Sequence, residues 1–411
     1  MTGTERGPAS RPALSRCIRV DADEFAHRYW GREPLLSTAS ELEGGFDDLF
    51  SAEAVDELLT RRGVRTPFIR MAHEGAVLAP SAYTASGGFG AEIADQVSSD
   101  KVLAEFAGGA TIVLQGLHRL WPPIIEFTRA LVADLGHPVQ VNAYVTPPSS
   151  QGFEPHYDTH DVFVLQVSGE KHWRIHAPVH VDPLRSQPWE QHRAAVARAA
   201  TQEPVIDAVL HPGDALYLPR GWIHSATALG ATSVHLTVGM SAYTRADVAA
   251  ALLEQLGEHA ALRASLPLGL DLHDAAALAP VVEETRRDLV EALRQADALG
   301  PAAALGRRFE ADTRAEPIAP LATLEALATL DASTPVRWRE SFAVRIQAVD
   351  DRVRLVTRTK TVSMPIEAES AVRRLASGGV LTPAELPGLD AESAVVVVRR
   401  LVHEGFVVAP A

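Results

Sequence analysis

The stretch EPHYDTHDVFVLQVSGEKHW gathers side chains of the kinds that bind metal ions, beginning with His156, Asp158 and His160. Two imidazoles and one carboxylate on one face of an octahedral ion such as Fe(II) leave three positions open for other molecules. Residues two apart on a strand point to the same side, so His156 and Asp158 are expected to turn inward while Tyr157 turns away. The spacing therefore predicts two of the three protein ligands of a metal site.

The third ligand is expected from a distant strand. His224 is the favoured candidate, because it follows the turn in PGDALYLPRGW and opens a new strand. His160 is a weaker alternative, since pairing it with Asp158 would leave His156 without a role. The chain has 16 histidines, and an isolated His-x-Asp triplet is an ordinary surface feature. Structural roles are therefore expected for His160, His172, His176, His180 and His211.

Lys171 opens the segment KHWRIH, a strand that is expected beside the metal strand. If the metal held one end of a dicarboxylate, a buried cation would have to pair with the distal carboxylate. Lys171 is the candidate for that cation, and the bland alternative is an exposed lysine in a hairpin. Asn142 and Tyr144 lie on the polar face of VQVNAYV and are expected to add hydrogen bonds.

These residues lie in a part of the sequence with β-strand patterns. VQVNAYV alternates strictly between aliphatic and polar positions, which indicates a strand with one buried face. VFVLQV and HWRIH read as two strands joined by the turn SGEK, and HSATAL and TSVHLTVGM read as two more on either side of Gly230. Short strands joined by Gly and Pro turns predict a barrel or sandwich.

Helical patterns precede and follow this β region. Helices are predicted at 21–31, 51–63 and 122–136, and the Gly/Ser-rich stretch from about 75 to 110 is predicted to form loops. Two amphipathic helices are predicted at 244–257 and 280–300. A short β-meander over 335–365 and a final run of helix, turn, helix and strand are expected to complete the chain.

Composition bounds the class of protein. At 411 residues, 46% hydrophobic and 22% charged, the chain is expected to form two or three globular domains without a membrane span. The N-terminus is polar, and one cysteine, Cys17, excludes an internal disulfide framework, so a cytoplasmic location is expected. A formal net charge of −14 argues against nucleic-acid binding, which relies on clustered Lys and Arg.

Four segments carry a resemblance to a known family. NAYVTPPSSQGFEPHYDTHDVFVLQVSGEKHWRIH, LHPGDALYLPRGWIHSAT, SVHLTVG and the opening FAHRYWGREPLL resemble the JmjC-type ribosomal oxygenases. That family consists of Fe(II)- and 2-oxoglutarate-dependent protein hydroxylases of the cupin superfamily. The likeness is specific over roughly residues 20–240 and rests on architecture beyond them.

The resemblance implies roles for individual residues. It makes His156, Asp158 and His224 the iron ligands, and Lys171 the partner of the distal carboxylate of 2-oxoglutarate, with Asn142 in the same pocket. His235, which shares a strand face with neighbouring polar residues, is expected near the cosubstrate or in the core. The implied reaction consumes O2 and hydroxylates a His or Arg side chain of a protein substrate, for which the family indicates a ribosomal protein.

The resemblance also implies an α+β architecture. A double-stranded β-helix barrel with flanking helices is expected over 1–240, a helical segment that forms a homodimer over 241–330, and a winged-helix-like domain over 331–411. Two alternatives stay open: a metal-dependent cupin enzyme that acts on a small molecule or peptide, and a winged-helix transcription regulator. The substrate groove is expected beside the loops SAYTASGGFG and APVHVDPLRSQPWEQHR.

Overall fold

The computed structural model describes residues 11–73, 75–148, 150 and 154–410, so the expected N-terminal tail lies outside the described residues. The chain divides into two compact units, Met1–Ala242 and Tyr243–Ala411. The finer division at residue 330 stays a prediction. No helix among the described residues has the length and apolar character needed to cross a membrane.

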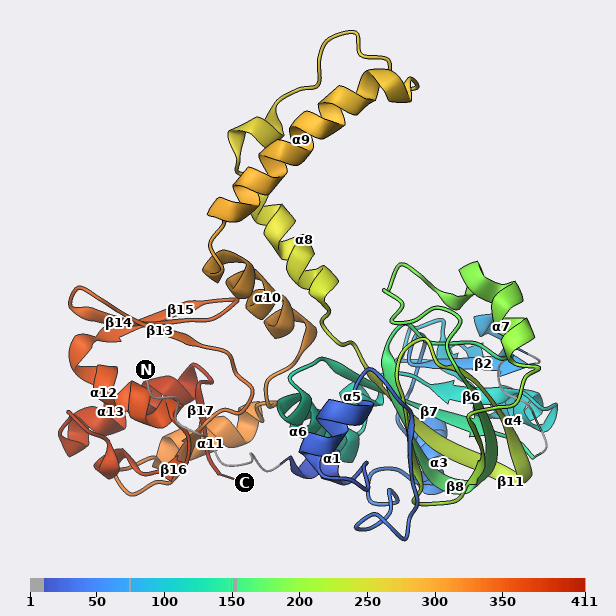
Figure 1. The fold of residues 1–411 in the computed structure, drawn as a ribbon. Coiled ribbons are helices and arrows are strands. Elements are labelled where there is room, and N and C mark those ends of the chain that lie inside the picture. Colours follow the sequence, from blue (N-terminus) through green and yellow to red (C-terminus); the bar gives the residue numbers. More distant parts are fainter. Residues whose placement is uncertain (1–10, 74, 149, 151–153, 411) are drawn as a thin grey trace. The chain divides into compact units, whose positions relative to one another are not determined.

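The first unit contains nearly all the strands that the motifs predicted (Figure 1). Its helices and strands in chain order are α1 (Pro12–Ser15), α2 (Ala22–Glu24), η1 (Phe25–Tyr29), β1 (Leu35–Ser37), α3 (Ala52–Arg61), β2 (Ile69–His73), β3 (Ala76–Val77), η2 (Pro80–Ala82), β4 (Thr84–Ala85), β5 (Gln96–Val97), α4 (Ser99–Ala107), β6 (Thr111–Leu114), α5 (Leu117–Leu120), α6 (Pro122–Leu135), β7 (Val139–Thr146), β8 (Asp161–His176), η3 (Trp189–His192), α7 (Arg193–Ala199), β9 (Ile206–Leu210), β10 (Ala215–Leu218) and β11 (Ile223–Met240).

One sheet organises this unit. Its strand order is β1-β10-β8-β11-β7-β6-β2-β3, and β9 pairs with β8. The long strands β8 and β11 are antiparallel to each other over most of their length. The first half of β8 also pairs with β10 and its second half with β9, while the second half of β11 pairs with β7. Residues from both β8 and β11 line the cavity that is described below.

The predicted hairpin at SGEK is wrong, because β8 runs through this segment as one strand. The two strands predicted on either side of Gly230 are likewise one continuous strand, β11. The glycines lie instead at an irregularity, where the register between β8 and β11 shifts between Leu229 and Val234. Gly169 has φ +64° and Gly230 also has φ +64°, a conformation that glycine adopts without steric cost. Left-handed glycines at a bulge let a strand bend and continue, so a glycine signal alone does not separate a turn from a bulge.

Gly169 should be far less tolerant of substitution than Gly230. A Cβ atom at Gly169 would lie 2.2 Å from the carbonyl oxygen of Thr232, whereas a Cβ at Gly230 would meet nothing within 4 Å. Both substitutions by alanine carry the same backbone cost of about 1 kcal/mol. Gly169→Ala is therefore expected to lower the thermal unfolding midpoint well beyond Gly230→Ala in calorimetry. Equal midpoints for the two variants would contradict the close approach.

The two faces of the sheet have different surroundings. On β7, Val141, Ala143 and Val145 are buried in the main core, which packs against the N-terminal helices. On β11, Val234 and Leu236 belong to the same core. Each buried aliphatic side chain contributes about 1.5–3 kcal/mol. On the opposite face of the sheet, Tyr144 of β7 and His235 and Thr237 of β11 line a cavity. The alternation predicted for VQVNAYV is present in the burial pattern of β7.

The helices that support this sheet follow their predicted caps. The Asp21 carboxylate accepts hydrogen bonds from the backbone N–H groups of Asp23 and Glu24, and the Ser51 hydroxyl accepts from Ala54. Helix α6 begins at Pro122 and ends before Gly136, which has φ +70°. The expectation of loops from 75 to 110 is wrong over α4, a helix that the neighbouring Gly/Ser-rich text concealed.

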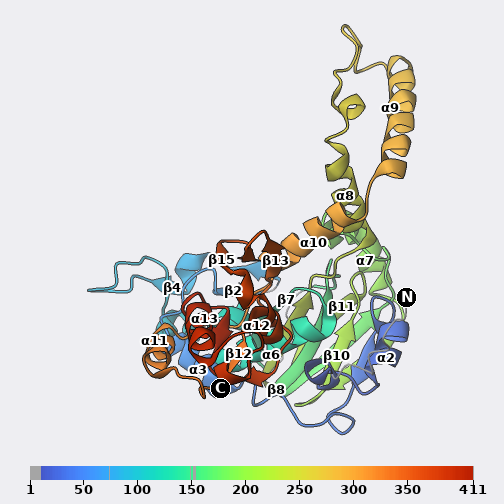
Figure 2. The same ribbon diagram turned by 90° about the vertical axis from the view of Figure 1, so that its left-hand side faces the viewer.

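The second unit combines a long helical segment with two small sheets (Figure 2). Its elements are α8 (Arg245–Leu256), η4 (Ala260–Arg263), α9 (Ala275–Gln295), α10 (Leu299–Asp312), α11 (Pro320–Thr329), β12 (Val336–Trp338), β13 (Arg345–Val349), β14 (Arg352–Val356), β15 (Thr361–Pro365), η5 (Ile366–Ala368), α12 (Glu369–Ala376), β16 (Val380–Leu381), η6 (Pro383–Glu385), α13 (Ala391–His403) and β17 (Val407–Val408).

Sequence signals place most elements of this unit. The predicted capping box of α8 forms, with Thr244 and Asp247 as its two partners. Helix α9 begins at Ala275, before the predicted start, and contains Pro280 in its first half. The predicted meander contains the sheet β13-β14-β15, while β12 joins β16 and β17 in a separate sheet. A core of its own, including Val353, holds the C-terminal part together.

Candidate metal centre and acid-binding cavity

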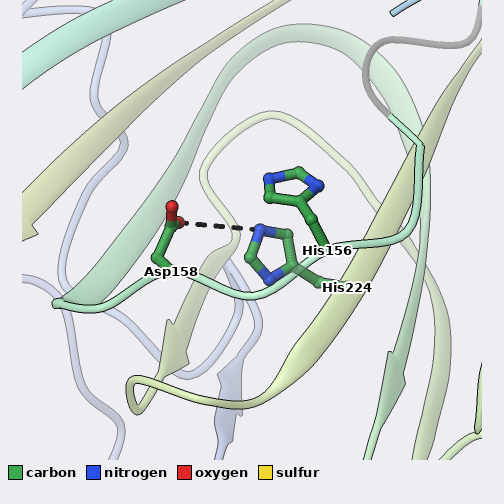
Figure 3. A group of neighbouring side chains, drawn as sticks. All are labelled: His156, Asp158 and His224. Carbon is green, nitrogen blue, oxygen red and sulfur yellow. Dashed lines mark ion pairs between the residues drawn. The ribbon is translucent and has the colours of Figure 1, made fainter. Parts of the chain in front are cut away.

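His156, Asp158 and His224 converge at one end of the cavity. One ligand atom from each lies within 4.8 Å of the other two. Figure 3 shows His156 and Asp158 on one chain segment and His224 reaching in from the neighbouring strand. The Nε2 atom of His224 lies 3.7 Å from Oδ2 of Asp158. The predicted convergence is therefore present in the structure.

The backbone around His156 differs from the prediction of a regular strand. His156 forms an isolated antiparallel bridge with His224, in which each backbone N–H donates to the carbonyl of the other residue. Residues 157 and 158 lie outside the strands. Tyr157 still turns away, as expected, and is buried beside Val196 and Ile223. One bridge pair thus positions two of the three side chains.

The hydrogen bonds of both imidazoles favour metal binding through Nε2. The Nδ1 atom of His156 lies 2.6 Å from the carbonyl oxygen of Glu154, and Nδ1 of His224 lies 3.1 Å from that of Trp222. A carbonyl oxygen only accepts, so Nδ1 carries the proton in each ring, and Nε2 is the nitrogen that can act as a metal ligand. Metal-binding histidines characteristically make this second hydrogen bond.

The electrostatics keep the donors in the states that a metal requires. Burial lowers the pKa of His224 to about 4, so its imidazole is neutral near pH 7. Burial acts to raise the pKa of Asp158, but the nearby charges of His160, His224, His156 and Arg70 outweigh it, and the net pKa is lowered. The side chain of Asp158 remains 32% exposed. The site thus offers a neutral imidazole at His224, a second imidazole at His156 and the carboxylate of Asp158, a set of donors that suits Fe(II), Mn(II) or Co(II).

Lys171 lies inside the cavity, not in an exposed hairpin. It is 3% exposed, and its Nζ atom donates to the hydroxyl of Thr146 at 3.1 Å. No carboxylate among the described residues pairs with it. Burial lowers the pKa of Lys171 to about 7, which reflects the cost of an unneutralised buried ammonium. An anion that entered the cavity would remove that cost.

The cavity has a volume of about 80 Å³. That is several times the roughly 10–15 Å³ that one water molecule needs, so the space suits a small organic acid. Tyr144 and His235, both predicted, line it, and their rings stack with centroids 5.1 Å apart. Burial lowers the pKa of His235 well below its usual value, and the charge of Lys171 lowers it further.

Asn142 is absent from the described lining of the cavity. Its Oδ1 atom accepts a hydrogen bond from the backbone N–H of Gly116 at 3.0 Å, which ties β7 to the start of α5. Asn142 lies on the same face of β7 as Tyr144 but two residues before it in the strand. Its predicted cosubstrate contact stays a prediction, and the structure gives it a backbone partner.

Several cavity residues were missing from the sequence-based set. Thr111, Trp173 and Thr237 line the cavity, and Thr146 binds Lys171. Trp173 and Thr237 each lie two residues from a predicted site residue on the same strand, so the period-2 rule could have identified them. Thr111 comes from β6, which no motif marked. Arg70 of β2 also acts here, because it contributes charge and a hydrogen bond to Tyr144.

The histidines expected to be structural lie apart from the triad. His160 is not one of the three converging residues, and its ring packs against Gly239. His172 contacts the carboxylate of Asp207. His180 lies 3.2 Å from the side-chain oxygen of Gln187, and His211 lies near Glu170.

One of the two predicted substrate-groove loops reaches the site. The ring of Trp189, from the loop that precedes α7, lies 6.2 Å from that of His156. The other loop, residues 81–90, contributes no residue to the described lining of the cavity. The loop around Trp189 is therefore the better candidate for contact with a substrate.

Comparisons with known proteins agree with this geometry. A family model described as JmjC domain matches residues 120–248. The bifunctional lysine-specific demethylase and histidyl-hydroxylase NO66 of Drosophila pseudoobscura pseudoobscura is 34% identical over 247 residues, covering 56% of this chain and 23% of that protein. Ribosomal oxygenase 1 of Gallus gallus is 31% identical over 279 residues, covering 66% and 44%. The chain thus spans less than half the length of these curated relatives.

Solved structures show the same fold. The ribosomal oxygenase YcfD of Escherichia coli, in complex with cobalt and 2-oxoglutarate, matches with a TM-score of 0.53 and 19% identity, covering 95% of this chain and 99% of that one. A complex of the same protein with cobalt and succinic acid gives a TM-score of 0.52. The predicted JmjC/cupin-type α+β fold is confirmed. The chain therefore contains a JmjC domain over residues 120–248 and is similar to proteins named ribosomal oxygenase.

Proposed function

We propose that the chain is an Fe(II)- and 2-oxoglutarate-dependent oxygenase that hydroxylates a His or Arg side chain of a ribosomal protein. The observation that carries this proposal is the placement of two ligand imidazoles, a carboxylate and a buried, unneutralised lysine in one small cavity. The names of the relatives, ribosomal oxygenase and histidyl-hydroxylase, support the class of substrate.

Each part of the cavity has a task in this reaction. His156, Asp158 and His224 would hold Fe(II), which supplies the activation of O2 with conversion of 2-oxoglutarate to succinate and CO2. Lys171 and Thr146 would bind the distal carboxylate of 2-oxoglutarate. The stacked rings of Tyr144 and His235 would limit water at that end. The second oxygen atom enters the C–H bond of the substrate, which the groove must present to the metal.

The decisive experiment measures turnover. The protein is purified without oxygen and loaded with Fe(II). Succinate formation from 2-oxoglutarate is then followed in air, with and without ribosomal proteins. The proposal expects succinate formation that depends on the added proteins, together with a product heavier by one oxygen atom in mass spectrometry. Absence of both signals in protein that binds Fe(II) and 2-oxoglutarate would contradict the proposed substrate. Absence of 2-oxoglutarate binding itself would contradict the proposed reaction.

Binding of 2-oxoglutarate should weaken as the pH rises above 7. Above pH 7 the free Lys171 is largely neutral and must take up a proton to pair with the carboxylate. The dissociation constant is therefore expected to rise by up to about tenfold per pH unit between pH 7 and 9. Over this range His235 stays neutral because its pKa is lowered well below 6.5, and Tyr144 stays neutral because burial raises its pKa.

Isothermal titration of the Mn(II)-loaded protein with 2-oxoglutarate from pH 6.5 to 9 tests this dependence. Lys171→Arg is the control, because a guanidinium stays charged over the whole range. Its dissociation constant should be independent of pH, whatever its absolute size. A constant affinity in the wild-type protein would show that Lys171 does not pair with the ligand.

We also propose that the helical segment of the second unit forms a homodimer and that residues 331–411 are a winged-helix-like domain. Helices α8, α9 and α10 carry large apolar side chains that are exposed in the single chain: Val248, Leu253, Val282, Val290, Leu293 and Leu299. Such faces are usually covered by a partner. Light scattering at micromolar concentration should give twice the chain mass, and a monomer mass would contradict the dimer.

A further inference from the structure

The second unit contains a basic cavity that the proposed reaction does not use. It has a volume of about 380 Å³ and is formed by the end of α10, the segment after β12 and the β14–β15 turn. Three arginines line it, Arg314, Arg339 and Arg358, against a single acid, Glu310. The cavity is therefore positive inside a chain whose formal net charge is −14.

Two of these guanidinium groups are available to a ligand. Arg314 and Arg358 are exposed and make no hydrogen bond or ion pair with any described residue. Arg339 is held in place, because its Nε donates to the carbonyl oxygen of Glu316 at 2.6 Å and its guanidinium lies 4.6 Å from the ring centre of Phe342. One fixed and two free guanidinium groups around one space are suited to a phosphate.

Besides the arginines, the cavity lining contains a residue with an unusual backbone conformation and two aromatic side chains. Ser341 has φ +53°, a left-handed conformation that is uncommon outside glycine and concentrates at binding sites. Phe309 and Phe342 add apolar side chains to the lining of the same cavity. Phosphate-binding arginines beside aromatic rings are the combination by which proteins bind nucleotides. The volume lies within the range of small-molecule sites.

The sequence that surrounds the cavity differs in net charge from the whole chain. Residues 335–374 contain nine Lys or Arg and five Asp or Glu, so this stretch is positive while the whole chain is negative. Lys360, next to the β14–β15 turn, is already paired with Glu404 at 2.7 Å. Arg337 and Arg373 also pair with glutamates, so Arg314 and Arg358 are the lining arginines left to bind an anion at this cavity.

We propose that this cavity binds a nucleotide, with the phosphate between Arg314, Arg339 and Arg358 and the base against the phenylalanine rings. The nucleotide is either free or part of a single-stranded RNA, since both present the same phosphate and base. This site lies wholly in the second unit and does not depend on the reaction proposed for the first.

Titration calorimetry of the full chain tests the proposal with four probes: adenosine 5′-monophosphate, adenosine, inorganic phosphate and an adenine RNA decamer. The nucleotide is expected to bind at least about tenfold more tightly than adenosine or phosphate alone, because only it uses both parts of the cavity. The double variant Arg314→Gln/Arg358→Gln should lose at least about tenfold in affinity. Both side chains are exposed, so the fold should persist, and thermal unfolding checks this.

Arg354→Gln is the matched control, because Arg354 is an exposed arginine of β14 outside the cavity. Its affinity should stay within about twofold of the wild-type value. Tighter binding of the decamer than of the mononucleotide would identify RNA as the source, and the reverse order a free nucleotide. Undetectable nucleotide binding, equal binding of inorganic phosphate, or unchanged binding in the double variant would overturn the proposal.

Discussion

Replacing His224 by alanine is expected to lower succinate formation at least about a thousandfold, which corresponds to about 4 kcal/mol in the activation barrier. His224 supplies the only proposed ligand that comes from β11, and its Nδ1–H is already committed to the carbonyl of Trp222. No other histidine in the converging group can replace its Nε2. Mn(II) affinity, measured by calorimetry without turnover, should therefore fall together with activity.

His172→Ala is the control for this variant. His172 lies on β8 between two cavity residues, but its ring contacts the carboxylate of Asp207 and does not line the cavity. Its metal affinity and activity should stay within about twofold of the wild-type values. Because His224 is 8% exposed and its removal leaves a gap, Asp158→Asn serves as a second, nearly isosteric test. Wild-type metal affinity in both His224→Ala and Asp158→Asn would exclude the proposed centre.

The parts of the site that the sequence predicts best depend on spacing within one strand. His156 with Asp158, and Tyr144 on the polar face of VQVNAYV, follow from the two-residue period of extended backbone. The sequence predicted that a strand begins near His224, but the spacing of residues could not show which segment this strand pairs with. The bridge between His156 and His224 is a contact between distant segments, for which no local pattern exists.

Other features could not be predicted, because the same sequence pattern is compatible with more than one local structure or contact. Gly169 suggested a hairpin turn and Gly230 a break between two strands, but both lie at an irregularity between two continuous strands. Thr146 directly follows the predicted strand VQVNAYV and was not among the predicted site residues, because only the fold brings its hydroxyl to Lys171. Asn142 and Tyr144 share a strand face, yet the Asn142 side chain accepts a hydrogen bond from the backbone N–H of Gly116, just before α5. Tertiary contacts decide such cases.

Replacing Lys171 by methionine is expected to raise the dissociation constant of 2-oxoglutarate by about 30- to 4,000-fold. Loss of one partner of a buried charge pair costs about 2–5 kcal/mol, because the ligand carboxylate would then be buried without a counter-charge. Methionine fills a similar volume, so the cavity should keep its shape. Mn(II) affinity should stay within about twofold, since Lys171 is absent from the converging metal group.

Lys101→Met is the matched control in the same unit, since Lys101 donates to the backbone carbonyls of Ser81 and Thr84, far from the cavity lining. The two variants should also differ in stability. Burial lowers the pKa of Lys171 from its usual 10.5 to about 7, so the folded protein resists protonation of this lysine. Lys171 therefore destabilises the fold increasingly as the pH falls from 10.5 toward 7. Lys171→Met should therefore unfold at a higher temperature than wild type at pH 6.

The 2-oxoglutarate affinity and the thermal stability of Lys171→Met together distinguish an oxygenase from a cupin enzyme that uses the metal alone. An oxygenase needs an anion site opposite the metal, so Lys171→Met should lose turnover at low 2-oxoglutarate and recover part of it in excess. A cupin that acts on another small molecule would have no reason to bury an unneutralised ammonium at this place. A Lys171→Met variant that gains stability and keeps full 2-oxoglutarate affinity would therefore favour that alternative chemistry.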